Sequence, residues 1–170
     1  MTAKEAFDKL LPSFKDYYNI NTENVLSPFV AEAEFVSHQE QYFLVKSAKL
    51  SDIDSKDHVY FAVESELTLG KASEMCLAAW DDGLKNVQPY YGHRNSDVTV
   101  FILCENTDIK TIKKCRKFNF SKSYKMMLYG WSHFKLVILN TDTNKLYYNR
   151  YGGEYHPLMK KFVKRVCRNK

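Results

Sequence analysis

Residues 98–104, Val-Thr-Val-Phe-Ile-Leu-Cys, form a continuous apolar run that restricts the folds open to this chain. A strand with one face in water alternates apolar and polar residues, whereas a strand covered on both faces is apolar along its length. We therefore expect residues 98–104 to form the central strand of a sheet that is covered on both sides.

Three strands are predicted upstream of this run. Residues 29–38 alternate apolar side chains with Glu32 and Glu34, and two further segments, 41–50 and 58–66, are rich in apolar and aromatic residues. Short polar stretches separate the three segments. This pattern indicates an antiparallel meander.

Helices are predicted around these strands. A capping box from Thr2 to Glu5 begins the first helix, in which Pro12 should cause a kink or a break. Thr68 suits the N-cap of a helix that runs to about Val87, and a shorter helix should follow the central strand and end near Lys117. A hairpin of residues 131–139 and 145–150 and a final helix from about 157 complete the order α-βββ-α-β-α-ββ-α. The predicted fold class is therefore α+β, a mixed sheet with helices packed on it.

The length of 170 residues suits one domain, so we expect a single α+β domain over residues 1–170. No apolar run reaches the ~18 residues that span a bilayer, and the first residues lack the apolar core of a secretion signal. A cytoplasmic protein without a membrane span is expected. Its four cysteines have no CxxC spacing and have apolar neighbours, which favours buried reduced thiols; they are Cys76, Cys104, Cys115 and Cys167.

Charge is distributed unevenly along the chain. Residues 1–108 contain 9 Lys and Arg against 18 Asp and Glu, whereas residues 109–170 contain 16 against 2. Clustered cations attract polyanions, or the acidic part of another copy, through a field that extends beyond individual contacts. The sequence thus predicts a basic C-terminal surface.

Six lysines are the candidate nucleic-acid-binding residues: Lys110, Lys113, Lys114, Lys117, Lys122 and Lys125. The first four have the spacing of one helical face, with Ile109 and Ile112 expected to hold that helix on the sheet. Phe118 and Phe120 alternate with the later cations, an arrangement that could hold a single strand by phosphate attraction and base stacking. The alternative is that the lysines are a solvated face and the aromatic residues belong to the core.

The last helix has an apolar side opposite a second group of cations: Lys160, Lys161, Lys164, Arg165 and Arg168. A basic amphipathic helix can lie on anionic lipid or on a partner, but at a chain end it more often packs on its own domain, which we favour.

Catalytic residues cannot be assigned from the sequence. Glu64 and Glu66 point to one side of a predicted strand and, with Glu40, could hold a divalent ion, although carboxylates on a solvated strand face have the same spacing. Ser132 and His133 point to opposite faces, so they are not a nucleophile and base pair. No P-loop, GxGxxG, GxSxG or zinc-ligand spacing is present, and no metal site or cofactor is predicted.

The opening order α-βββ-α-β, over about residues 1–104, resembles the core of the restriction-endonuclease-like PD-(D/E)XK superfamily. That resemblance implies magnesium-binding carboxylates and a lysine that assists the attacking water. The matching stretch here reads Glu64-Ser65-Glu66, with no lysine in place and no Pro-Asp before it. The stretches Tyr129-Gly-Trp-Ser-His-Phe-Lys-Leu-Val-Ile-Leu and Tyr147-Tyr-Asn-Arg-Tyr-Gly-Gly-Glu also resemble an uncharacterised prokaryotic domain family of similar length.

Three functions are therefore open. The first is non-catalytic binding of a polyanion, most plausibly nucleic acid, through the basic C-terminal surface. The second is a protein-interaction or self-association module, in which the acidic part of one copy meets the basic part of another. The third is a metal-dependent nuclease that uses Glu64 and Glu66.

Overall fold

The computed structural model describes residues 1–35, 55–91, 93 and 95–168. A seven-stranded mixed sheet runs through them in the order β1-β2-β3-β4-β6-β5, and β7 also pairs with β6. Its strands are β1 Tyr18–Asn21, β2 Ala31–Phe35, β3 Ser55–Leu67, β4 Asn95–Thr107, β5 Ser121–Ser123, β6 Trp131–Asn140 and β7 Lys145–Tyr148. The helices are α1 Ala3–Leu10, α2 Leu69–Lys85, α3 Ile109–Cys115 and α4 His156–Arg168, with 3₁₀ turns η1 Leu11–Phe14 and η2 Gly152–Tyr155.

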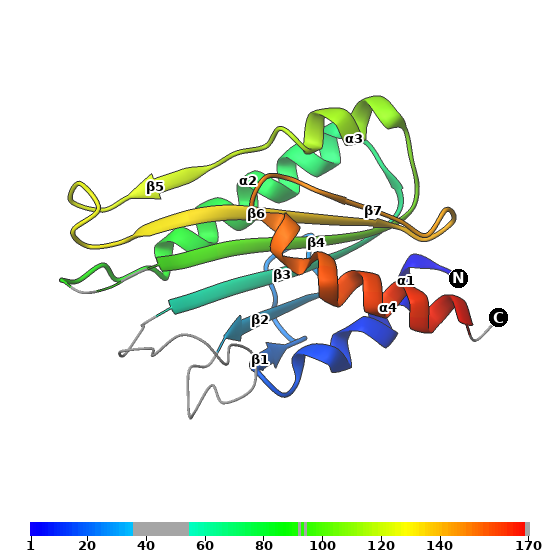
Figure 1. Ribbon diagram of the computed structural model, residues 1–170, viewed down its shortest axis with the longest axis horizontal. Coiled ribbons are helices and arrows are strands. Elements are labelled where there is room, and N and C mark those ends of the chain that lie inside the picture. Colours follow the sequence, from blue (N-terminus) through cyan, green and yellow to red (C-terminus); the bar gives the residue numbers. More distant parts are fainter. Residues whose placement is uncertain (36–54, 92, 94, 169–170) are drawn as a thin grey trace.

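The central position of the apolar run is confirmed. β4 lies between β3 and β6 and is parallel to both. Its side chains alternate between two separate cores: Val100 and Ile102 pack on the side of α2 and α3, and Phe101 and Leu103 pack on the side of α1 and α4. Figure 1 shows the two helical layers, with α4 and α1 in front of the sheet and α2 behind it. The mixed α+β architecture predicted from the sequence is therefore present.

The N-terminal helix forms as predicted. The Thr2 hydroxyl accepts a hydrogen bond from the backbone N–H of Glu5, and the Glu5 carboxylate accepts one from the N–H of Thr2. α1 ends at Leu10, and Pro12 stands in the following 3₁₀ turn because it has no N–H to continue the α-helical pattern.

The meander is present, but its strands differ from those expected. β1 pairs with β2 and β2 with β3, all antiparallel. β1 was not predicted, because its Tyr-Asn-Ile-Asn sequence is short and carries two asparagines. The predicted strand 41–50 lies outside the described residues.

The helix after β4 is shorter than expected. Asp108 caps α3 by accepting hydrogen bonds from the backbone of Lys110 and Thr111, and the helix ends at Cys115, before Lys117. Ile112 is buried, but Ile109 is 58% exposed, so its predicted packing role was wrong. The buried stripe is centred on Thr111, Ile112 and Cys115, and Ile109 falls at its edge in the first turn.

The C-terminal elements follow the prediction, with one addition. β6 and β7 form an antiparallel hairpin, and the short strand β5, which we did not predict, pairs with the other end of β6. α4 buries Met159 and Phe162 against the sheet, as expected for a terminal helix that packs on its own chain. Within the described residues, no helix has both the length and the apolar character needed to cross a bilayer.

Three of the cysteine predictions are confirmed. Cys76, Cys104 and Cys115 are free and buried. Burial raises the pKa of Cys104 to about 12 and that of Cys115 to about 11, so both remain protonated thiols at neutral pH. The side chain of Cys167 is not described.

Candidate functional site

The six predicted lysines all reach solvent. α3 carries Lys110, Lys113 and Lys114, the turn after it carries Lys117, β5 carries Lys122, and the loop after β5 carries Lys125. Among the ion pairs of the described residues, none includes any of these six side chains. Within the described residues, these six side chains are exposed and have no carboxylate oxygen within 4.0 Å.

The aromatic residues beside these lysines belong to the core and do not form an exposed platform for base stacking. Phe118 and Phe120 stack on each other with their ring centroids 6.1 Å apart, and Phe120 lies 4.9 Å from Phe134 in the core. Both rings pack against the core on the α2 side. The alternative interpretation, in which these aromatic residues hold the fold together, is thus correct for this pair.

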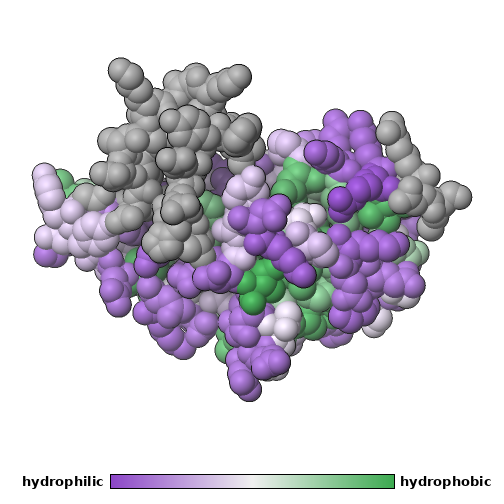
Figure 2. All heavy atoms as spheres, turned by 90° about the horizontal axis from the view of Figure 1, so that it is seen from below, coloured by the Kyte–Doolittle hydropathy of each residue, from purple (hydrophilic) through white to green (hydrophobic). Residues whose placement is uncertain are grey.

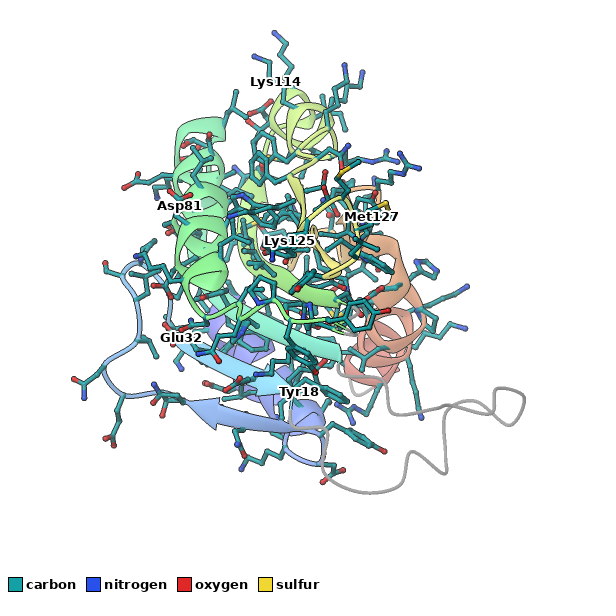
Figure 3. All side chains as sticks on the ribbon, turned by 90° about the vertical axis from the view of Figure 1, so that its left-hand side faces the viewer. Tyr18, Glu32, Asp81, Lys114, Lys125 and Met127 are labelled. Atoms are coloured by element: carbon teal, nitrogen blue, oxygen red, sulfur yellow. The ribbon has the colours of Figure 1, made fainter. Side chains whose placement is uncertain are left out.

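The two basic helices lie on opposite sides of the sheet. α3 packs in the same core as α2, whereas α4 packs in the core that contains α1. Lys114 extends into solvent from α3 at the top of Figure 3. The cations of α3 and α4 therefore form two separate surfaces.

A groove lies between η1 and α4, with a volume of about 750 Å³. Four cations line it, one turn apart or adjacent along α4: Lys160, Lys161, Lys164 and Arg165. Ser13, Leu158 and Phe162 also contribute to its walls. Figure 2 shows that the face containing α1 and η1 is largely hydrophilic, with small apolar areas between the charged side chains.

An ionic cluster of the buried residues Asp57, Asp97 and Lys135 with the half-exposed Glu154 links the sheet to the segment that leads into α4. Lys135 lies on β6 and is only 7% exposed. Its ammonium Nζ is 2.8 Å from Oδ2 of Asp97 on β4 and also binds Oε1 of Glu154 on η2. The pair between Lys135 and Glu154 thus ties η2, and with it the start of α4, to the sheet.

Asp57 on β3 completes the cluster. Oγ1 of Thr99 donates a hydrogen bond to Oδ1 of Asp57 over 2.7 Å, and the hydroxyl of Tyr155 donates to Oδ2. The hydroxyl of Tyr18 lies 3.4 Å from the same Oδ2 atom. Since Tyr155 is the last residue of η2, this contact is a second link between the sheet and α4.

Burial and the neighbouring charges together set the proton affinities in the cluster. Desolvation raises the pKa of Asp57 above its usual value, although the charge of Lys135 and the hydrogen bonds from Tyr155 and Thr99 oppose this effect. Desolvation alone would lower the pKa of Lys135, but the nearby carboxylates of Asp57, Asp97 and Glu154 outweigh it, so that pKa lies above the usual range. Lys135 is therefore charged at neutral pH.

The domain family DUF8052, a domain of unknown function, matches residues 2–161. This chain belongs to the DUF8052 family. No curated protein and no solved structure shows significant similarity to it. The match agrees with the predicted resemblance to an uncharacterised domain family, whereas no similarity to the PD-(D/E)XK superfamily is found.

Two of the residues considered for metal binding in this DUF8052 chain, Glu64 and Glu66, lie within the described part of the structure, where both contact Lys71. Lys71 Nζ lies 2.6 Å from Oε2 of Glu64 and also donates to the backbone carbonyl of Glu66. Glu40 is outside the described residues. In the part of the chain that the structure describes, no group of three or more His, Cys, Asp or Glu side chains could hold a metal ion.

The ionic cluster of this DUF8052 domain was not predicted from the sequence. The signal was a lysine inside the apolar stretch Phe134-Lys135-Leu136, together with Asp97 directly before the apolar run of β4. A charged residue in a buried strand requires a partner, but the sequence does not show which strands are neighbours. The cations of the α4 groove were identified, but their common groove with η1 was not.

Proposed function

We propose that this protein binds a polyanion, with nucleic acid as the first candidate, through the basic side chains of its C-terminal region. The observation that carries this proposal is the group of four cations along one wall of the groove between η1 and α4. Residues 109–170 contain only two acidic residues, Asp142 and Glu154, against 16 Lys and Arg. The excess positive charge cannot be neutralised within that region.

The α4 groove fits a phosphate backbone better than the α3 surface does. The groove cations form two adjacent pairs, Lys160 with Lys161 and Lys164 with Arg165, one helical turn apart. The ionic cluster and two buried apolar residues, Met159 and Phe162, hold this helix on the sheet. A helix that is held in place keeps its cations in one arrangement, and a concave surface lets several of them contact one strand. The α3 lysines form a convex face that can contribute long-range attraction.

Oligonucleotide binding by charge-reversal variants tests this proposal. Lys160→Glu with Lys164→Glu alters the groove, Lys113→Glu with Lys114→Glu alters α3, and Lys56→Glu with Lys85→Glu is the control of equal charge change outside the basic region. Fluorescence anisotropy with single-stranded and duplex DNA should show the largest loss for the groove variant, a smaller loss for the α3 variant and little change for the control. Equal losses in all three variants would contradict a specific basic site and indicate an effect of net charge alone.

Self-association is the second candidate function, and an acidic cleft favours it. The cleft has a volume of about 440 Å³, lies between β1, β2 and α2, and is lined by the carboxylates of Glu32, Glu34 and Asp82. The basic α4 of another copy has the complementary charge. Sedimentation at low and high salt distinguishes the two functions, because a salt-sensitive oligomer with no affinity for oligonucleotides would support self-association and contradict polyanion binding.

A further inference from the structure

The loop between β5 and β6 presents three consecutive apolar residues to solvent. Met126 is 93% exposed, Met127 is 63% exposed and Leu128 is 65% exposed. We call these three residues the apolar tip. Single exposed apolar side chains are normal on protein surfaces, but three in sequence at the end of a hairpin form a contiguous patch that usually marks an interaction site.

The backbone of this loop keeps the apolar tip directed outward. Lys125, Met126 and Met127 have φ angles of 43°, 53° and 73°, in the left-handed region that costs energy for any residue with a Cβ atom. Three such residues in succession are uncommon outside glycine and asparagine. Conformations of this kind persist where the surrounding structure enforces them, and they are concentrated at functional sites.

Hydrogen bonds at the base of the loop hold residues 125–127 in this conformation. The N–H of Tyr129 donates to the carbonyl of Tyr124, and the N–H of Tyr124 donates to the carbonyl of Gly130. Nδ1 of the buried His93 lies 3.0 Å from the carbonyl of Tyr129, and the hydroxyls of Tyr124 and Ser132 are 2.9 Å apart. The base is therefore tied both to β6 and to the loop that precedes β4.

Aromatic and cationic groups surround the base of the apolar tip. Lys125 Nζ lies 4.3 Å from the ring centroid of Tyr129, and Lys122 Nζ lies 5.6 Å from that of Tyr124. Tyr91 is 79% exposed and its ring is 6.4 Å from that of Tyr129. Residues 109–141 contain no Asp or Glu, so the charge close to this hairpin in the chain is entirely positive. Lys125 and Met127 lie at the end of the molecule that faces the viewer in Figure 3.

We propose that the apolar tip inserts into the surface of a bilayer that contains anionic lipids. Apolar side chains at the tip, with tyrosines and lysines together at its base, match the acyl chains below and the interface and anionic headgroups above that a membrane surface presents. Nucleic acid offers the negative charge but no apolar layer for two methionines and a leucine. A projecting tip would need a matching pocket on a protein partner. A bilayer accepts such a tip without a pocket.

Such a contact is peripheral and reversible. A tip of three residues reaches only the outer acyl layer, so binding depends on the added attraction of Lys122 and Lys125 to acidic headgroups. This inference goes beyond the proposed function and uses a different part of the molecule from the α4 groove. Each can fail without the other.

Vesicle sedimentation tests the proposal. Wild-type protein is mixed with vesicles of phosphatidylcholine alone or of phosphatidylcholine with phosphatidylserine, and should bind the second kind more strongly. Met126→Ser with Met127→Ser should lower binding to the anionic vesicles by about tenfold or more, because two apolar side chains no longer enter the membrane. Lys122→Gln with Lys125→Gln should also weaken binding to anionic vesicles, by about fivefold for each lysine removed, and should leave the weak binding to phosphatidylcholine unchanged.

Leu77→Ser is the matched control, since Leu77 is an exposed apolar residue on α2, 47% exposed and away from the hairpin. It should bind vesicles as the wild type does. Thermal unfolding of the tip variant should match that of the wild type, which excludes misfolding as the cause of lost binding. Met126→Trp adds a tryptophan to Trp80 and Trp131, so the emission of this variant minus that of the wild type should shift to shorter wavelength on anionic vesicles and be quenched by brominated lipid.

Two results would overturn the proposal. One is vesicle binding by the tip variant equal to that of the wild type. The other is no binding of the wild type to the anionic vesicles; a change of oligomeric state in the tip variant would then assign the apolar tip to a contact between protein chains. Oligonucleotide binding by the tip variant should be unchanged, so this experiment and the test of the α4 groove give separate answers.

Discussion

Lys135 is the residue whose burial most shapes the C-terminal half of the molecule. It lies between carboxylates from β3, β4 and η2 and is almost completely removed from solvent. An ion pair of this kind is a weak source of net stability, because desolvation of the charges offsets much of their attraction. Its role is therefore to specify where η2 and α4 dock on the sheet.

Replacement of Lys135 tests this role. Lys135→Met keeps most of the side-chain volume but leaves Asp57 and Asp97 buried without a counter-charge, and we expect a loss of about 3–5 kcal/mol in the free energy of unfolding. Urea denaturation measures this loss. Lys145→Met, at an exposed lysine of β7, is the control and should change stability by no more than about 0.5 kcal/mol. A loss below about 1 kcal/mol for Lys135→Met would show that the cluster is not a structural anchor.

Asp57 should make stability depend on pH. Its pKa is higher in the folded protein than its ordinary value of 3.8, so between these two pKa values the folded state holds a proton that the unfolded state has released. Stability attributable to Asp57 is greatest below its unfolded pKa and falls as pH rises through the folded pKa. Each tenfold difference in proton affinity corresponds to about 1.4 kcal/mol.

Asp57→Asn removes this titration. The substitution also changes the hydrogen bonds with Thr99 and Tyr155, but that effect is present at every pH and shifts the whole curve. The informative quantity is the difference in urea midpoint between wild type and variant as pH rises from about 4. The wild type should lose stability relative to the variant over this range. A constant difference would show that Asp57 keeps an ordinary pKa in the fold, and a difference of opposite slope would show that its pKa is lowered; either result would contradict the account.

At the scale of elements, local signals in the sequence predicted helix boundaries well and long-range pairing less well. The capping residues Thr2 and Thr68 and the breaker Pro12 act within one helical turn, and each has the role expected of it. β1 was missed because its stability comes from pairing with β2 rather than from its own residues. The salt bridges of Lys135 join strands and turns far apart in the chain, and no local pattern specifies them.

The crossing of α2 over β4 is a contact that the sequence does not reveal. A Cβ atom added at Gly83 would lie 2.5 Å from Cγ2 of Val98, a distance that side chains do not tolerate. We therefore expect Gly83→Ala to lower the free energy of unfolding by about 1–3 kcal/mol, although alanine favours helix more than glycine does.

Gly70→Ala is the matched control in the same helix. Its nearest neighbour would be Oγ1 of Thr68 at 3.9 Å, an ordinary contact, so this variant should be neutral or more stable by up to about 1 kcal/mol. Thermal or urea denaturation of both variants provides the measurement. Equal stability of the two would mean that α2 and β4 are not in close contact at Gly83.

At the scale of the whole molecule, charge separates along the chain and also in space. Carboxylates gather around β2 and α2 in the acidic cleft, while unpaired lysines occupy α3, β5 and α4. The charge counts in the sequence led us to expect a basic C-terminal surface. The counts do not reveal that α3 and α4 lie on opposite sides of the sheet. The path of the chain from β4 to α3 and from β7 to α4 determines which face of the sheet each helix covers.

The dependence of oligonucleotide affinity on salt tests the central claim most directly. For duplex DNA, the logarithm of the association constant falls with the logarithm of salt concentration with a slope of about −0.9 for each phosphate neutralised. If the four cations of the α4 groove bind phosphates, wild-type protein should bind with a steep negative slope, and Lys160→Glu with Lys164→Glu should make that slope shallower by about two contacts. Wild-type binding that does not change between about 50 and 200 mM salt, or no binding at the lower concentration, would contradict the account.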